Sequence, residues 1–304
     1  MNKTMNKTMN RTLSLLLICL LSAIAAISSA QDELGALKIA ALEALITAPP
    51  SRALPIVQRV LKSDDREDIK ARALFVLSQI DLPEAHATLV AMAQDSTGAL
   101  QFEAIRMIGV SGAPEAMASL AEIYAAGSED VRGSVLKAYL IADDSQAVYR
   151  IAAAATDPQE LERALHMLGA MGAVDEVRAL GARVEMYETL AQAYAMTGDI
   201  ESLRKMAFND AKPEAQVFAI RSLGLTSAPA ANAALLNIYR EQQSQAVRHA
   251  ALEGLMISGY DQGVLALYRE TQDIAEKREL LRFLVMMGSD AVWDEIDQAL
   301  DERP

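Results

Sequence analysis

The chain has 304 residues, a formal net charge of -13 at pH 7 and a single cysteine. This acidity argues against nucleic acid or an anionic lipid surface as a partner, because binding a polyanion requires a dense basic surface. With one cysteine, the chain can hold neither an internal disulfide nor a multi-thiolate metal site.

Residues 1–30 have the pattern of a secretory signal peptide. The basic head consists of Lys3, Lys7 and Arg11. An apolar run from Leu13 to Ile27 follows, and small residues lead up to Ala30. The run is too short for a convincing membrane span. We therefore expect cleavage near Ala30 and a periplasmic or secreted mature chain, residues 31–304. Loss of the three cations changes its net charge from -13 to -16.

Cys19 is not expected to carry a lipid anchor. A lipidation site needs a small residue just before the cysteine, whereas Ile18 stands there, and Cys19 lies in the middle of the apolar run. An uncleaved N-terminal anchor is the alternative to export by cleavage. The tandem Met-Asn-Lys-Thr repeat leaves Met1, Met5 and Met9 as alternative start residues.

From residue 32 onward, one helical unit recurs about every 30 residues, which marks a repeat architecture. Its reference positions are Ala41, Ala73, Ala104, Val135, Ala164, Thr189, Ala219, Ala251 and Leu280. The next residue is Leu or Ile in all nine copies, and another apolar residue follows three residues later. Apolar residues at this spacing form one face of a helix.

Each of these helices is followed by a second amphipathic segment. Several of the first helices are expected to end at a glycine in the left-handed conformation, namely at Gly112, Gly172, Gly198, Gly259 and Gly288. Second segments are expected at Pro83–Ala93, Pro114–Ala125, Pro229–Arg240 and Asp290–Leu300, since proline favours the first helical position. The sequence therefore predicts an all-α solenoid of about nine two-helix repeats, with no internal domain break and an acidic terminal helix.

The unit resembles the HEAT-like repeat, especially the short bacterial form found in phycobilin-lyase-type proteins. The matching residues are Val247-Arg248 before Ala250-Ala251, Ala164–Gly169 and Ala219–Gly224. The resemblance implies that the reference helices line the concave face of the solenoid, and it says little about activity. One copy, Thr189–Asp199, is as similar to a tetratricopeptide helix as to a HEAT-like helix. It follows the shortest spacing between reference positions, so a kinked or shortened helix is expected near Val174–Glu185.

If the resemblance holds, the side chains two residues after each reference position line the concave face. They are Glu43, Phe75, Arg106, Lys137, His166, Ala191, Arg221, Glu253 and Arg282. Four of the nine are Lys or Arg, and exposed apolar residues flank them, which suits an extended peptide with carboxylates. The predicted protein-binding residues are Phe75, Phe102, Arg106, Lys137, His166, Tyr187, Arg221, Leu225 and Arg282. The alternative is that these are ordinary solvated helix positions.

No residues with the spacing of a catalytic or metal site are found. The histidines, His86, His166 and His249, lie in three different repeats, without a second His or Cys at ligand spacing. The chain also lacks the His-Glu dipeptides through which the HEAT-repeat enzyme deoxyhypusine hydroxylase binds iron. We expect no cofactor. Two further arginines, Arg132 and Arg248, are expected in structural ion pairs.

These observations favour an exported, non-enzymatic scaffold that binds a protein or peptide, an acidic one included, along its concave face. Neither nucleic acid nor membrane insertion of the mature chain is expected. One alternative is an enzyme or chromophore lyase, by resemblance to the phycobilin lyases. Another is a structural subunit of an envelope complex.

Overall fold

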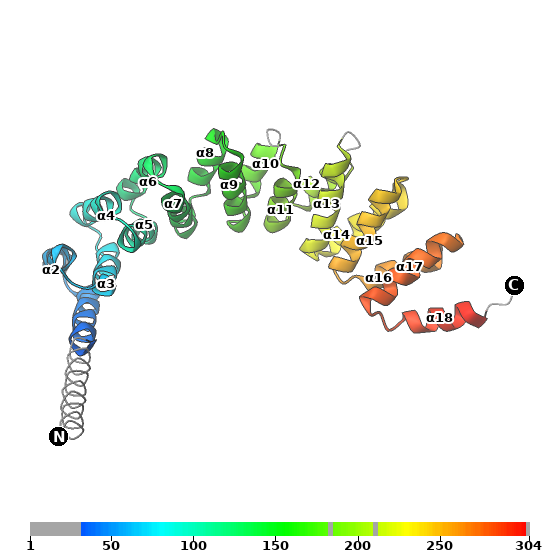
Figure 1. Cartoon of the computed structure of the whole chain (residues 1–304), viewed down its shortest axis with the longest axis horizontal. Coiled ribbons are helices and arrows are strands. Elements are labelled where there is room, and N and C mark those ends of the chain that lie inside the picture. The colour runs from blue at the N-terminus through cyan, green and yellow to red at the C-terminus, as the bar shows by residue number, and fades with distance from the viewer. Residues whose placement is uncertain (1–31, 182–184, 209–211, 302–304) are drawn as a thin grey trace, which may run out of the picture. The chain divides into compact units, whose positions relative to one another are not determined.

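The computed structural model describes residues 32–181, 185–208 and 212–301, and within these ranges every regular element is a helix (Figure 1). The predicted signal peptide and Cys19 lie outside the described residues. The chain divides into two compact units, one up to Ala142 and one from Asp143. The prediction of an unbroken solenoid across this point stays a prediction, and each unit is described by itself.

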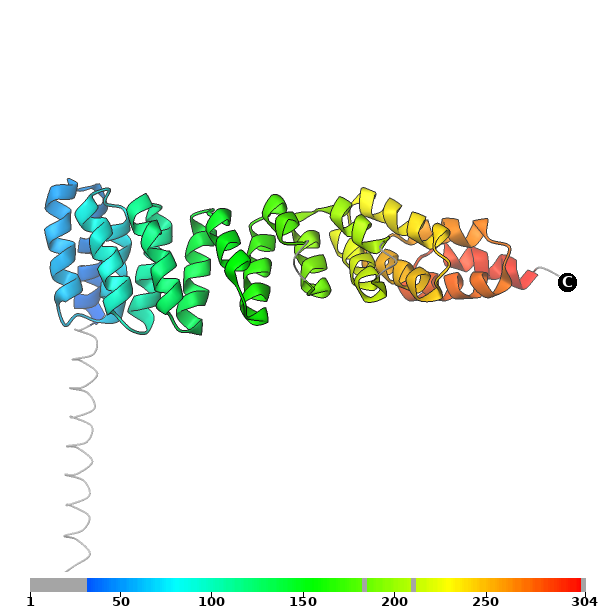
Figure 2. The same ribbon diagram turned by 90° about the horizontal axis from the view of Figure 1, so that it is seen from above.

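The first unit is built of antiparallel helices (Figure 2), which are arranged in two layers (Figure 1). Its elements are a helix over residues 32–44, η1 (Leu45–Thr47), α2 (Pro50–Lys62), α3 (Glu67–Ser78), α4 (Pro83–Asp95), α5 (Ala99–Ser111), α6 (Pro114–Ala126) and α7 (Glu129–Ile141). Helices α3, α5 and α7 pack side by side in one layer, and α4 and α6 pack in the other. All three odd-numbered helices carry a reference position of the repeat.

The second unit continues the same alternation. Its elements are α8 (Ser145–Ala154), α9 (Pro158–Ala170), α10 (Val174–Gly181), α11 (Tyr187–Thr197), α12 (Ile200–Ala207), α13 (Pro213–Thr226), α14 (Pro229–Glu241), α15 (Gln245–Ile257), α16 (Asp261–Glu270), α17 (Ile274–Met287) and α18 (Val292–Asp301). Helices α9, α11, α13 and α15 form one layer, and each even-numbered helix from α8 to α16 packs against an odd-numbered neighbour.

Most of the predicted helix ends are confirmed. All five predicted glycines have a positive φ, between 61° and 72°. Helices α4, α6 and α14 begin at the expected prolines, and α18 begins two residues later than expected, at Val292. The shortened helix near Val174 is also confirmed, since α10 has 8 residues.

The core consists of the apolar columns that the sequence repeats. In the column that follows each reference position, every residue is buried except Leu281, which is partly exposed. Burying one such leucine stabilises the fold by roughly 1.5–3 kcal/mol. Because each helix buries this stripe against its neighbours in the stack, the two-helix units form one continuous core within each unit.

Candidate functional site

The spacing between neighbouring odd-numbered helices depends on two positions of the repeat. One lies five residues after the reference position of the first helix, and the other lies three residues after the reference position of the next helix. In α13 and α15, these positions hold Gly224 and Gly254. A Cβ atom at Gly224 would lie 2.5 Å from the carbonyl oxygen of Gly254, so the two backbones touch. Gly109 of α5 meets Ala138 of α7 in the same way, also at 2.5 Å. Small residues therefore allow direct backbone contact between these two pairs of helices. We call the contact between neighbouring odd-numbered helices a joint.

At the next joint, the equivalent positions hold Met256 in α15 and Phe283 in α17. Helices α15 and α17 pack against each other much less extensively than α13 and α15 (Figure 1). The gap is an open cleft with a volume of about 580 Å³. Its walls are Gln245, His249, Glu253, Met256, Ala275, Arg278, Glu279, Arg282, Phe283 and Met286. We call it the α15–α17 cleft.

The acidic residues of the α15–α17 cleft already have partners. Arg221 of α13 donates to Glu253, with Nε 2.7 Å from Oε2. The Nδ1 atom of His249 lies 3.1 Å from Oε1 of Glu279, and the His249 ring meets the Phe283 ring edge-on, with centroids 5.4 Å apart. Both carboxylates are thereby held against this chain's own side chains.

The basic residues of α17 differ from Arg221 in this respect. Arg278 and Arg282 are both exposed, and neither makes an ion pair or hydrogen bond with another described residue. They are four residues apart, so their side chains share one face of the helix. Met256, Phe283 and Met286 provide apolar surface beside them. The cleft thus combines two free guanidinium groups with an apolar floor.

An exposed apolar row leads to this cleft. It consists of Leu225 on α13, Ile257 on α15 and Met286 on α17, which are 61%, 46% and 62% exposed. All three stand six residues after their reference positions. Leu225 is one of the binding residues predicted from the sequence. The row gives an extended partner apolar contacts in three successive repeats.

The other predicted binding residues of the second unit lie outside the cleft. His166 of α9 reaches Gln192 of α11, with Nε2 3.2 Å from Oε1. The Tyr187 hydroxyl accepts a hydrogen bond from Lys212, whose ammonium lies 4.6 Å from the Tyr187 ring centroid. Both side chains therefore take part in contacts within the unit.

In the first unit, the four predicted residues lie on three neighbouring helices. Arg106 of α5 binds Glu103 of its own helix through two hydrogen bonds of 2.9 and 2.5 Å. Phe75 of α3 lies under the Arg72 guanidinium, 5.4 Å from its ring centroid. Phe102 is partly exposed on α5 and Lys137 is exposed on α7. Only Arg282, of all the predicted binding residues, lines the α15–α17 cleft.

The sequence interpretation missed Arg278, Met256 and Phe283 as site residues, and it treated His249 as unremarkable. A signal was present, because Arg278 and His249 both stand two residues before their reference positions, as do the predicted Phe102 and Tyr187. That column and the chosen one flank the same exposed helix face. Reading both together would have placed Arg278 beside Arg282.

The two arginines expected in structural ion pairs pack against tyrosines of the preceding helix. Arg248 donates to Glu276 and lies 4.3 Å from the centroid of the Tyr239 ring. Arg132 lies 5.6 Å from the Tyr124 ring centroid, and its Nε donates to the Tyr124 carbonyl oxygen at 3.3 Å. The ion pair is confirmed for Arg248, with a partner one repeat further along.

A family model described as HEAT repeats matches residues 60–140 and 200–299, which together are more than half of the chain. The chain belongs to the HEAT-repeat family. The predicted α-solenoid class is confirmed, and the α15–α17 cleft lies within the second matched range. No match is found among curated proteins.

Two solved structures are similar to this HEAT-repeat chain. One is the complex of CpcE and CpcF of phycocyanin lyase from Nostoc sp. PCC7120, with 18% identity and a TM-score of 0.35, over 79% of this chain and 95% of that chain. The other is human deoxyhypusine hydroxylase, with 15% identity and a TM-score of 0.33, over 76% of this chain and 99% of that chain. Neither similarity supports a functional assignment.

Across residues 32–181, 185–208 and 212–301, the chain shows neither a metal-binding cluster nor a membrane-spanning helix. No group of three or more His, Cys, Asp or Glu side chains there is arranged to hold a metal ion. In the same residues, no helix has both the length and the apolar character needed to cross a bilayer.

Proposed function

We propose that this HEAT-repeat chain is an exported, non-enzymatic scaffold that binds an extended protein segment, and that the α15–α17 cleft takes a carboxylate of that segment. The pair of free guanidinium groups on Arg278 and Arg282 is the observation that carries the proposal. Arginine presents a planar fork of donors that matches a carboxylate. The bound carboxylate is an aspartate or glutamate side chain flanked by apolar residues.

The apolar surface beside the two arginines supports an extended protein segment as the ligand, rather than a small carboxylic acid. Met256, Phe283 and Met286 border the two arginines, and the apolar row of Leu225, Ile257 and Met286 continues across α15 to α13. Apolar anchors beside an arginine are a common composition of binding surfaces.

The net charge of the chain further restricts the kind of segment that is expected to bind. At -13, the chain repels a strongly acidic protein at long range. The expected segment therefore carries one or two carboxylates among apolar residues, and is not a polyacidic tract. Because the contact is partly electrostatic and exposed, rising salt weakens it.

Export belongs to the same proposal and rests on the sequence of residues 1–30. The basic head, apolar run and small residues before Gln31 have the order that a signal peptidase requires. N-terminal sequencing of the protein from the envelope of cells that produce the full chain tests this. Gln31 is the expected first residue, and an intact segment on envelope-bound protein contradicts cleavage.

Peptide binding is tested by NMR of the purified protein labelled with ¹³C at its methionine methyl groups. Met286 lines the α15–α17 cleft, and a Met286→Leu variant assigns its signal. The probe is an acetylated, amidated pentapeptide of alternating Leu and Glu with two Glu residues, and its control has Gln in place of both. We expect a saturable shift of the Met286 signal with the Glu peptide only.

Substitutions decide which arginines bind. Arg278→Gln and Arg282→Gln should each weaken the Glu peptide by about fivefold or more, since each removes a charge-assisted hydrogen bond. Arg106→Gln is the matched control, because Arg106 is engaged by Glu103 in α5. Equal binding of the two peptides, or unchanged affinity in the Arg278→Gln and Arg282→Gln variants, contradicts the proposal.

A further experiment tests the proposal of a non-enzymatic scaffold against the alternative of a chromophore lyase. Incubation of the purified protein with a tetrapyrrole should give no protein-specific absorbance and no turnover. Either signal would favour the enzyme.

A further inference from the structure

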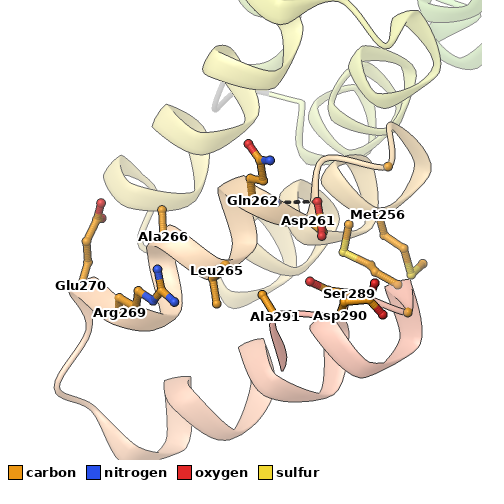
Figure 3. Close-up of a pocket in the computed structure, with 13 residues that line it drawn as sticks. Met256, Asp261, Gln262, Leu265, Ala266, Arg269, Glu270, Ser289, Asp290 and Ala291 are labelled. Atoms are coloured by element: carbon orange, nitrogen blue, oxygen red, sulfur yellow. Dashed lines mark hydrogen bonds between the residues drawn. The ribbon is translucent and has the colours of Figure 1, made fainter. Parts of the chain in front are cut away.

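A second cleft lies between α16 and the segment that leads into α18, on the other layer of the same repeats (Figure 3). It has a volume of about 990 Å³. One wall is the first turns of α16, with Asp261, Gln262 and Leu265, and the opposite wall is the Gly288–Ala291 turn. We call it the α16–α18 cleft, and the function proposed above does not use it.

Two carboxylates line this cleft, one from each wall, together with the buried hydroxyl of a serine. Figure 3 shows Asp261 of α16 facing the turn that carries Ser289 and Asp290. One oxygen of Asp261 accepts the backbone N–H of Gln262 at 2.8 Å, which leaves the rest of its acceptor capacity open. Neither Asp261 nor Asp290 makes an ion pair with a described residue. Two carboxylates therefore face the same space without a cation.

The hydroxyl of Ser289 is an independent sign that a polar group belongs here. Ser289 is only 5% exposed, and its Oγ atom has no hydrogen-bond partner among the described residues. A buried polar atom without a partner is costly, and native structures contain few of them. A donor placed between the carboxylates and this hydroxyl would satisfy it.

The one cationic residue among those that line the cleft, Arg269, is engaged elsewhere. Arg269 binds the largely buried carboxylate of Glu295, with nitrogen–oxygen distances of 2.7 and 2.6 Å. Glu270, the remaining acid of the rim, is held by Arg240 of α14 at 2.9 Å. The free charge in the cleft is therefore that of Asp261 and Asp290, and it is negative.

The remaining lining is apolar and suits the methylene stem of a long basic side chain. Met256, Leu265, Ala266 and Met287 provide it. Lysine and arginine bury such stems along apolar surface while their charged ends reach polar groups. The net charge of -13 also attracts a basic segment at long range.

From this arrangement we infer that the α16–α18 cleft binds a lysine or arginine side chain of a protein partner. The ammonium or guanidinium group lies between Asp261 and Asp290 and donates to Ser289. The stem packs on Met256, Leu265 and Met287. This site adjoins the carboxylate site proposed between α15 and α17, with which it shares Met256, and has the opposite charge preference.

The two clefts have separate NMR reporters. Met287 lines the α16–α18 cleft and Met286 lines the α15–α17 cleft, so ¹³C-methyl signals of the full purified protein distinguish them. The probe is an acetylated, amidated pentapeptide with lysine between pairs of alanines, and its control has norleucine in place of lysine. We expect a saturable shift of the Met287 signal with the lysine peptide only, and none of the Met286 signal.

Variants test the acceptors. Asp261→Asn and Asp290→Asn should each weaken the lysine peptide by about fivefold or more, and Ser289→Ala should weaken it less. Asp297→Asn, at an exposed position of α18 outside the cleft, is the control. Equal responses to the lysine and norleucine peptides, or unchanged affinity in both aspartate variants, overturn the inference. If 1,5-diaminopentane binds as tightly as the peptide, the assignment to a protein segment is overturned. Since the two methionines report separately, failure here leaves the α15–α17 result unaffected.

Discussion

The guanidinium carbon of Arg248 lies 4.3 Å from the centroid of the Tyr239 ring, and both side chains donate hydrogen bonds to Glu276. One cation thereby connects α14, α15 and α17. The same geometry recurs in two other repeats, where Arg132 lies over Tyr124 and Lys277 lies over Tyr268, at 5.6 and 5.3 Å. In each case the cation stands three residues before a reference position, so this contact belongs to the repeat.

A double-mutant cycle measures the contact. Arg248→Met and Tyr239→Leu should together destabilise the protein by less than the sum of the single changes, because each single variant already loses the cation–π contact. We expect a coupling of about 0.5–2 kcal/mol for this partly buried pair. Urea unfolding of the four proteins provides the free energies. Strictly additive effects would show that the stacking is geometrically present but energetically neutral.

A pH dependence is expected from Asp199, which is the N-cap of α12 and accepts from the Ser202 N–H at 3.2 Å. Burial alone would raise the pKa of Asp199. The two hydrogen bonds from Arg178, at 2.6 and 2.7 Å, and those from Ser202 outweigh burial and hold this pKa below its usual value. A depressed carboxylate pKa stabilises the fold above the unfolded value, about 3.9, and this contribution is lost as pH falls through the folded value.

Asp199→Asn isolates that charge, because asparagine is an equally good N-cap. The variant should be less stable than the natural protein at pH 7. The difference should shrink as pH falls below about 4, since the unfolded chain then binds a proton that the folded carboxylate still resists. Urea midpoints measured at several pH values between 7 and 3 test this. A difference that stays constant over the whole range would assign the loss to packing instead of charge.

Alanine substitution should have opposite effects at two glycines, one inside the close backbone contact between α13 and α15 and one outside it. In Gly224→Ala the new methyl group would lie 2.5 Å from the Gly254 carbonyl oxygen, so the helices must move apart. We expect a loss of about 1–3 kcal/mol from this overpacking. Gly133→Ala in α7 is the control, since its Cβ meets nothing within 4 Å outside its own helix. It should stabilise the protein by about 0.5–1 kcal/mol. Equal changes in stability at both sites would show that helix propensity alone determines the effect of each substitution.

The helices could be predicted because their signals are local. The spacing of Leu252 and Leu255 around Ala251 is sufficient to define the buried face of α15, and Gly259 marks its end. The same information recurs in each repeat, so errors at one copy are corrected by the others. This is why the two-helix period and most helix boundaries could be read without a structure.

The site was harder to predict because it depends on pairs of residues from neighbouring repeats. Arg221 and Glu253 belong to the same predicted column, one repeat apart, and their opposite charges pair across the layer at 2.7 Å. Reading the column as a set of free cations therefore overestimated its charge. Arg106 is neutralised more locally, by Glu103 one turn earlier. Arg282 remains free because the residue before it in the column, Glu253, is already engaged.

The opening of the α15–α17 cleft is a further consequence of such a pair. Where the α13–α15 joint has two glycines, this joint has Met256 and Phe283, and we expect these side chains to hold the helices apart. Helix–helix distances vary over about 8–10 Å with the side chains at the contact. Replacing both residues by alanine should therefore bring α15 and α17 about 1–2 Å closer.

Spin labels measure this movement directly. The only cysteine of the full sequence is Cys19, outside the described residues, so labels at Ile257→Cys and Met286→Cys report on these two helices once the segment before Gln31 is removed. Pulsed electron paramagnetic resonance should give a shorter mean distance in the Met256→Ala, Phe283→Ala background. Leu225→Ala on α13, an exposed apolar change away from the cleft, should leave the distance unchanged. If the double variant keeps its helical circular dichroism and its original distance, the separation of α15 and α17 is set by their connecting segments and not by this pair.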